Sequence, residues 1–292
     1  MRNIFEEDAK MAAKVIVICS QKGGIGKTFS TTEISSELQA RNKRTCAIDG
    51  DWMSALTSRQ FPDGLPPEID ENPQGRTFTP GEAHVSRMYA GPDTPFNPLT
   101  LPDGRGFMGA TDDLNDVNNR HADCAFDFKE RFEALKEAYD YIIIDSSPVW
   151  SNLLLANHIV ADFLLIPTVL EKSSRLGVEK HINSFKKIKE RYNPGLKLLG
   201  VFVTQATVAN YKKPMLEGRY AQVDTANLEM LIEILEEQGF SKEHLLEVMP
   251  FVATKVREAI ELNTTIKEHD PKSPLVTSYD RLVDTIIART GG

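Results

Sequence analysis

The run Ser20–Thr28, with the sequence SQKGGIGKT, constrains the fold of this chain more than any other segment. It follows five apolar residues, Val15–Cys19, that we expect to form a buried strand, and it precedes Phe29–Arg41, which we expect to be a helix. A strand, a glycine-rich loop ending in Lys-Thr and a helix, in this order, are typical of a phosphate-binding P-loop. The glycines allow a tight turn that points several backbone N–H groups at one anion, beside the positive end of the helix dipole. The segment therefore predicts a site for nucleotide phosphates.

The residues of this loop predict how the phosphates and a metal ion are held. We expect Lys27 to reach the outer phosphates and the Thr28 hydroxyl to bind Mg²⁺. The other residues expected to contact the nucleotide at this loop are Gly23, Gly24, Ile25, Gly26 and Phe29.

Further apolar runs alternate with amphipathic helical patterns along the chain. The strand-like runs are Thr45–Ile48, Tyr141–Ile144, Phe163–Ile166, Leu198–Val203 and Leu245–Met249. The helical patterns are Phe126–Ala138, Val178–Tyr192, Thr225–Gln238 and Ser278–Ala288. This alternation predicts an α/β fold: a doubly wound, mostly parallel sheet with helices on both faces. We expect a single domain over residues 1–292, with an N-terminal extension at 1–14 and a loop-rich insertion at 61–105.

The composition limits the class of protein. With 34 Lys and Arg against 42 Asp and Glu, the net charge of -8 argues against a uniformly basic coat, although a local basic patch is compatible with it. Three cysteines at scattered positions indicate neither a disulfide framework nor a zinc site. No apolar run approaches the ~20 residues that span a bilayer. We therefore expect a cytoplasmic protein.

Carboxylates follow two of the predicted strands. Asp49 and Asp51 end the second strand, and Asp145 ends the strand that begins at Tyr141. Ligands of doubly wound sheets gather at the carboxyl ends of the strands, so these side chains should lie beside the P-loop. The alternative interpretation of Asp49 and Asp51 is that they cap the next helix.

A second lysine restricts the match to a particular type of P-loop. Lys22 gives the sequence Lys-Gly-Gly-x-Gly-Lys-Thr, with Gln21 at a position where the general pattern has glycine. This resembles the deviant P-loop of the ParA/MinD family of partition and positioning ATPases, and the resemblance extends from Val15 to Ala288. It implies that ATP and Mg²⁺ bind between the subunits of a homodimer, where Lys22 contacts the partner's nucleotide like an arginine finger. The alternative is a solvated loop lysine.

The resemblance also assigns roles to the carboxylates. Asp51 would orient the attacking water, and Asp49 would support the site near Lys27 or Mg²⁺. Asp145 would lie just beyond the direct ligands of Mg²⁺. The expected metal site is thus Thr28, Asp49 and Asp145, and the expected catalytic residues are Lys22, Lys27 and Asp51.

Later segments resemble the part of the family that holds the base. The resemblance places Thr204, Pro250 and Phe251 near the adenine. Two single positions and one segment depart from the family pattern: Phe29 replaces a usual Thr, Phe251 replaces a common Arg, and Trp52–Ala55 replaces Pro-Gln-Gly-Asn. The last departure lies on a segment that shapes the dimer and partner surface, so an unusual partner is expected.

The resemblance to the compact ParA-type members of the family implies what ATP hydrolysis is used for. They bind DNA without sequence preference as ATP dimers, and a ParB-type centromere-binding or cargo adaptor protein stimulates their slow hydrolysis, which segregates plasmid or chromosomal DNA. A nucleoid-associated protein is implied. The candidate DNA contacts are Lys180, Lys186, Lys187, Lys189 and Arg191 on one predicted helix, and Lys212, Lys213 and Arg219 beyond it. For each single lysine, a solvated charged face is the alternative.

Two other functions fit the same motifs. One is an ATP-dependent adaptor, MinD-like or involved in conjugation or cargo positioning, that binds protein or membrane rather than DNA. An adaptor that binds a membrane is disfavoured, because the closing segment Tyr279–Gly292 has only two arginines and these are offset by two aspartates. We therefore expect no membrane partner. The other is a nucleotide-binding scaffold with negligible turnover, which the presence of Lys22 and Asp51 disfavours.

Overall fold

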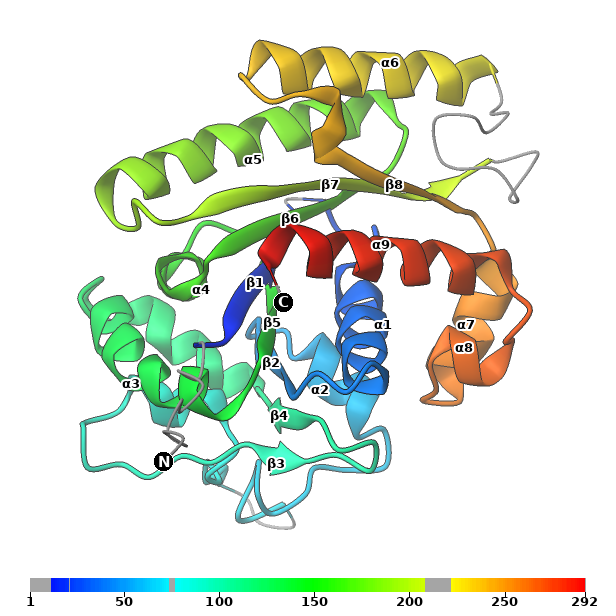
Figure 1. Ribbon diagram of the computed structural model, residues 1–292. Helices are drawn as coiled ribbons and strands as arrows, with labels where there is room; N and C mark the ends of the chain where they lie inside the picture. The colour runs from blue at the N-terminus through cyan, green and yellow to red at the C-terminus, as the bar shows by residue number, and fades with distance from the viewer. Residues whose placement is uncertain (1–11, 21, 74–76, 208–221, 292) are drawn as a thin grey trace, which may run out of the picture.

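The computed structural model describes residues 12–20, 22–73, 77–207 and 222–291. They contain one eight-stranded sheet with the spatial order β3-β4-β2-β5-β1-β6-β7-β8. Neighbouring strands are parallel except for the antiparallel pair β3 and β4. The strands are β1 (Lys14–Ile18), β2 (Thr45–Gly50), β3 (Leu99–Thr100), β4 (Gly106–Met108), β5 (Tyr141–Ser146), β6 (Phe163–Thr168), β7 (Lys197–Ala206) and β8 (Leu245–Pro250). The predicted doubly wound fold is confirmed (Figure 1).

Helices cover both faces of the sheet because its strands are apolar on both sides. In β1, Val15 and Val17 belong to one hydrophobic core, and Ile16 and Ile18 belong to another. The first core includes α3 (Cys124–Ala138), α4 (Asn152–Val160), α5 (Lys172–Arg191) and α6 (Gln222–Glu237). The second includes α1 (Lys27–Ala40), α7 (Ala253–Glu261), α8 (Ile266–His269) and α9 (Pro274–Thr290). Figure 1 shows α5 and α9 on opposite sides of the sheet. In the described part of the chain, no helix has the length and apolar character to cross a membrane.

The structure contains every predicted strand and helix, with ends that differ by a few residues, and adds helices that the sequence patterns did not predict. One of these is α4, in which every residue after Asn152 is buried. A helix that is buried all round has no exposed polar face and so no clear amphipathic period, and the apolar run at its start resembles a buried strand. The short helices α2 (Ala55–Gln60), α7 and α8 were also not predicted.

The loop-rich insertion at 61–105 packs against the sheet near β2 and β4. It contains the 3-10 helix η1 (Val85–Tyr89) and β3. Its apolar residues form a third cluster with the sheet and α2, which consists of Ala47, Leu56, Ile69, Ala83, Leu101 and Phe107. Two further 3-10 helices, η2 (Asp112–Asn119) and η4 (Lys242–His244), precede α3 and β8. Residues 1–11 of the predicted N-terminal extension lie outside the described residues.

Candidate nucleotide-binding site

The P-loop connects β1, in the middle of the sheet, to α1. Gly24 (φ 73°) and Gly26 (φ 84°) adopt the left-handed conformation that glycine tolerates best. Gly26 is the N-cap of α1, and no side chain of the described residues caps this helix end. The first N–H groups of α1, which begins at Lys27, therefore remain available for an anion.

Two residues at the end of β7 hold the loop in this shape. The Thr204 hydroxyl lies 3.0 Å from the carbonyl oxygen of Ile25 and 3.1 Å from that of Thr168. The Gln205 amide donates a hydrogen bond to the Gly24 carbonyl oxygen over 3.0 Å. Thr204 was expected at the adenine, and the structure shows in addition that it fixes the P-loop backbone. Gln205 was not singled out by the sequence, since this contact joins positions 181 residues apart.

Thr28 and Asp145 meet directly behind the loop. The Thr28 hydroxyl donates a 2.6 Å hydrogen bond to Asp145 Oδ2. Asp145 is only 2% exposed, and its Oδ1 has no hydrogen-bond partner among the described residues. Burial, reinforced by the charge of Asp49, raises the pKa of Asp145 to about 7, although the Thr28 hydrogen bond and Lys27 oppose this. A hydroxyl and a half-satisfied buried carboxylate are hard oxygen donors that suit Mg²⁺ and its waters, so these residues fit the expected ion.

Asp49 and Asp51 lie at the end of β2, with different surroundings. Asp49 Oδ2 accepts hydrogen bonds from the Thr57 backbone N–H (2.8 Å) and hydroxyl (2.7 Å). Its Oδ1 lies 3.3 Å from the Asp51 backbone nitrogen, and burial raises its pKa to about 6. Asp49 thus anchors α2 to β2, and its role at the metal stays a prediction. Asp51 accepts a hydrogen bond from the Met53 N–H over 3.1 Å.

Gly50, between these two carboxylates, is required by close packing. A Cβ atom there would lie 2.9 Å from the Asp145 carbonyl oxygen and equally close to Asn157 Oδ1. Asn157, on α4, donates from Nδ2 to the Gly50 carbonyl oxygen over 3.1 Å. The sequence patterns missed Asn157 because they missed α4. The end of β2 is therefore held between β5 and α4.

An apolar cavity of about 260 Å³ adjoins the P-loop. The residues expected near the nucleotide that line it are Gly26, Phe29, Thr204, Pro250 and Phe251. Its other lining residues include Gln205 at the end of β7 and residues of β8, α7 and α9. An apolar pocket beside a phosphate site suits the flat ring of a base. Phe251 is 54% exposed at its rim.

A family model described as an AAA domain matches residues 13–198. The chain belongs to this family. It is 27% identical over 282 residues to the chromosome-partitioning ATPase Soj of Thermus thermophilus, an alignment that covers 96% of this chain and 98% of Soj. The resemblance to the ParA/MinD family is thereby confirmed.

Solved structures show the same fold at lower sequence identity. Apo McdA of Cyanothece superposes with a TM-score of 0.71 at 19% identity, over 94% of this chain and 99% of McdA. A cobyrinic acid a,c-diamide synthase from Mycobacterium smegmatis, with bound ADP and magnesium, gives a TM-score of 0.68 at 19% identity, over 96% and 97% of the two chains. This chain thus shares its fold with both proteins, one of which was solved with ADP and magnesium.

Lys22, the second lysine of the P-loop, forms an ion pair with Glu171 of the same chain. Glu171 is the residue before α5. The side chains are 33% and 63% exposed, and exposed pairs of this kind stabilise by only about 0–1 kcal/mol. The pair is therefore weak enough to exchange for another anion, and the role of Lys22 in trans stays a prediction.

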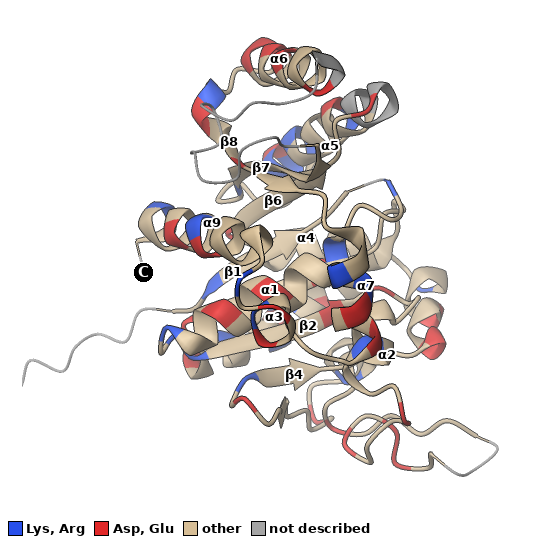
Figure 2. Cartoon of the chain, turned by 90° about the vertical axis from the view of Figure 1, so that its right-hand side faces the viewer, with Lys and Arg blue, Asp and Glu red and all other residues tan. Residues whose placement is uncertain are grey.

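The basic residues predicted to contact DNA differ in their availability. On α5, Lys186 donates to Gln238 Oε1 and Lys189 to the Leu196 carbonyl oxygen, each over 2.8 Å. Lys180 and Lys187 are exposed. Figure 2 shows basic residues on α5 next to the acidic residues of α6. The second predicted cluster, Lys212, Lys213 and Arg219, lies outside the described residues.

Proposed function

We propose that this ParA-type chain binds ATP with Mg²⁺ at the P-loop, dimerises around the nucleotide, binds DNA non-specifically, and hydrolyses ATP when a partner protein stimulates it. The cargo would be plasmid or chromosomal DNA. The observation that carries the proposal is the arrangement of Thr28 and Asp145, with one carboxylate oxygen unpartnered among the described residues, directly behind an uncapped helix end. Such a site offers backbone N–H groups to an anion and hydroxyl and carboxylate oxygens to a cation.

Each residue of the site has a role in hydrolysis. The P-loop N–H groups and Lys27 would hold the phosphates, and Asp51 would orient a water towards the terminal phosphorus. Water adds across the bond between the β- and γ-phosphates and yields ADP and phosphate. When bound, Mg²⁺ would neutralise charge on the phosphate oxygens. Lys22 would leave Glu171 and place a positive charge on the partner's nucleotide.

DNA binding is supported by the exposed basic residues of α5. Among the described residues, no hydrogen bond or ion pair of Lys180 or Lys187 would have to break before these side chains meet a phosphate backbone. A dimer would present two copies of this face, which would offset the acidic average of the chain.

The test is retention of the protein on random-sequence duplex DNA with ATP, with ADP and without nucleotide, across a salt series. Retention with ATP alone, weakening steeply with salt, is the expected result. Lys180→Ala combined with Lys187→Ala should lower retention and the salt slope. The matched control is Lys186→Ala, which removes a lysine already bonded to Gln238 and should have a smaller effect.

A second candidate function is an ATP-dependent adaptor that positions protein without binding DNA. It is favoured by the hydrogen bonds that engage Lys186 and Lys189 and by the net charge of -8. ATP-dependent dimerisation with no DNA retention under any nucleotide would select this function.

A further inference from the structure

Arg59, on α2, is a buried arginine that the phosphate and metal chemistry does not use. Its side chain is 6% exposed. Its Nη2 donates to the Thr264 carbonyl oxygen over 3.0 Å, but Nε and Nη1 have no hydrogen-bond partner among the described residues. A buried charge with unsatisfied donors is destabilising unless another interaction offsets it. The surroundings of Arg59 therefore indicate what it does.

The aromatic ring of Phe29 supplies that interaction. The guanidinium carbon of Arg59 lies 4.6 Å from the ring centroid, within the range of a cation–π contact. Phe29 follows Thr28 in the first turn of α1, and its ring lines the apolar cavity beside the P-loop. Tyr279 of α9 lines the same cavity, with its ring centroid 6.1 Å from that of Phe29. Arg59 thus supports one wall of the base pocket from behind.

Arg59 is itself held by the end of β2. Thr57, two residues earlier on α2, donates both its N–H and its hydroxyl to Asp49. The Thr57 hydroxyl also accepts a hydrogen bond from the Ala110 N–H over 2.9 Å. Because α2 is short and doubly anchored, Arg59 has a fixed position relative to the Asp49–Asp51 segment.

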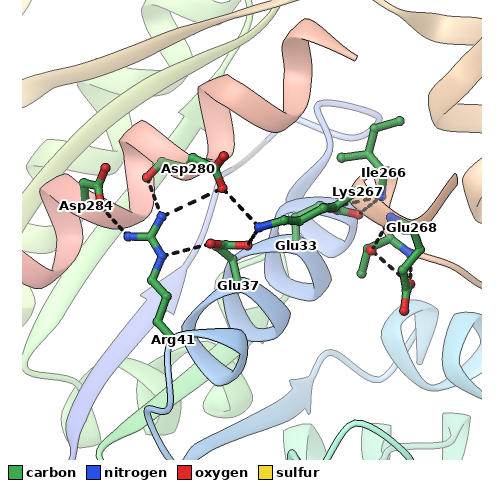
Figure 3. A network of polar contacts seen from close by, with 9 residues as sticks. Glu33, Glu37, Arg41, Ile266, Lys267, Glu268, Asp280 and Asp284 are labelled. Carbon is green, nitrogen blue, oxygen red and sulfur yellow. Dashed lines mark hydrogen bonds and ion pairs between the residues drawn. The ribbon is translucent and has the colours of Figure 1, made fainter. Parts of the chain in front are cut away.

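Arg59 also lies close to a carboxylate. Its Nη2 lies 3.7 Å from Glu33 Oε1, one turn beyond Phe29 on α1. Both Glu33 oxygens accept from the Ile266 N–H, over 3.1 and 3.2 Å, so Glu33 is fixed as well (Figure 3). The guanidinium therefore contacts both an aromatic ring and a carboxylate that other hydrogen bonds hold in place.

We propose that Arg59 is a positioning residue for nucleotide binding, which stacks on Phe29 to fix the pocket wall against which the base lies. The inference rests on the proposed function, because it concerns the same nucleotide site. It gives a physical reason for the departure at position 29: a phenyl ring loses the hydroxyl of threonine but offers a face to Arg59.

The test is a double-mutant cycle read out as ADP affinity by titration calorimetry, with Arg59→Met, Phe29→Leu and the double variant. Each single variant should weaken ADP binding about three- to thirtyfold, which is the range that cation–π contacts span from exposed to desolvated sites. Because the two residues act as one unit, the double variant should bind no more weakly than the weaker single variant. Fold losses that multiply would overturn the proposal.

Arg41→Met is the matched control for a general loss of stability. Arg41, at the end of α1, forms ion pairs with Glu37 and Asp284 and does not line the cavity (Figure 3). It should lower the melting temperature and leave ADP affinity unchanged. An equal loss of affinity in Arg41→Met and Arg59→Met would overturn the proposal.

Arg59→Lys covers the case in which Arg59→Met does not fold. Lysine keeps the charge and can still make a cation–π contact, so Arg59→Lys should lose less ADP affinity than Phe29→Leu, and an equal or larger loss would overturn the proposal. A wild-type protein that binds no ADP refutes both the proposed function and this inference. Wild-type binding with independent effects of Arg59 and Phe29 refutes this inference alone.

Discussion

Asp145 should destabilise the nucleotide-free protein, because its carboxylate is buried and only Oδ2 has a hydrogen-bond partner among the described residues. Burial, followed by the charge of Asp49, raises its pKa from 3.8 to about 7. In the unfolded chain the same carboxyl ionises near pH 4. Between about pH 4 and pH 7, unfolding therefore releases a proton. The free energy of unfolding should fall as the pH rises through this window and stay lower above it.

Replacing Asp145 by Asn removes this dependence, and the amide can still bond to the Thr28 hydroxyl. The difference between a pKa of 3.8 and one of about 7 corresponds to about 4 kcal/mol, which is the upper limit of the gain at pH 8. We expect Asp145→Asn to be about 1–3 kcal/mol more stable than the wild type at pH 8 and no more stable at pH 4. The assay is urea unfolding with EDTA and without nucleotide, while a parallel assay should show loss of Mg²⁺-dependent hydrolysis.

Asp140→Asn is a control of opposite sign. Arg44 lowers the pKa of Asp140, so the stabilisation by this carboxylate is present above its unfolded pKa and is lost as the pH falls. Asp140→Asn should therefore be less stable than the wild type at pH 8. Identical pH profiles of the wild type and Asp145→Asn would refute the reasoning about Asp145.

Three further substitutions test the rest of the site. Asp51→Ala should keep ATP binding and dimerisation but lower hydrolysis by about 100-fold, and unchanged turnover in a phosphate-release assay would remove Asp51 from its role. Lys22→Ala should keep nucleotide binding but weaken the ATP-dependent dimer, so a dimer of wild-type strength by sedimentation would contradict its role in trans. Gly50→Ala should lower the free energy of unfolding by about 1–3 kcal/mol, because the new methyl group meets Asn157 and the Asp145 carbonyl. Retention of full stability by thermal unfolding would show that this packing relaxes easily.

Local sequence patterns were sufficient to predict the P-loop and the position of Asp145 beside it. The segment from Val15 to Thr28 contains the strand, the glycine turn and the start of the helix, and the structure places left-handed conformations at Gly24 and Gly26. Asp145 was placed behind the loop because parallel strands bring their carboxyl ends to one edge of the sheet. These predictions depend on contacts within one segment or on the general topology of α/β folds.

The same sequence patterns could not predict contacts between distant segments of the chain. Whether Lys186 is available to DNA depends on Gln238, which lies 52 residues further along the chain. Asn157 was missed because α4 is buried on all sides, and Thr57 because α2 is only six residues long. In each case the packing of the helices determines which residue the side chain contacts.

The sequence by itself determined the phosphate site, the class of fold and the family, because the P-loop is a local structure and alternating apolar runs admit few arrangements. Only the tertiary structure decided what each carboxylate and cation contacts. Asp49 lies on Thr57, Lys22 on Glu171, and Arg59 on the ring of Phe29. The partner of a charged side chain is a residue that folding brings within a few ångströms of it. Sequence patterns do not contain the distance between two such residues.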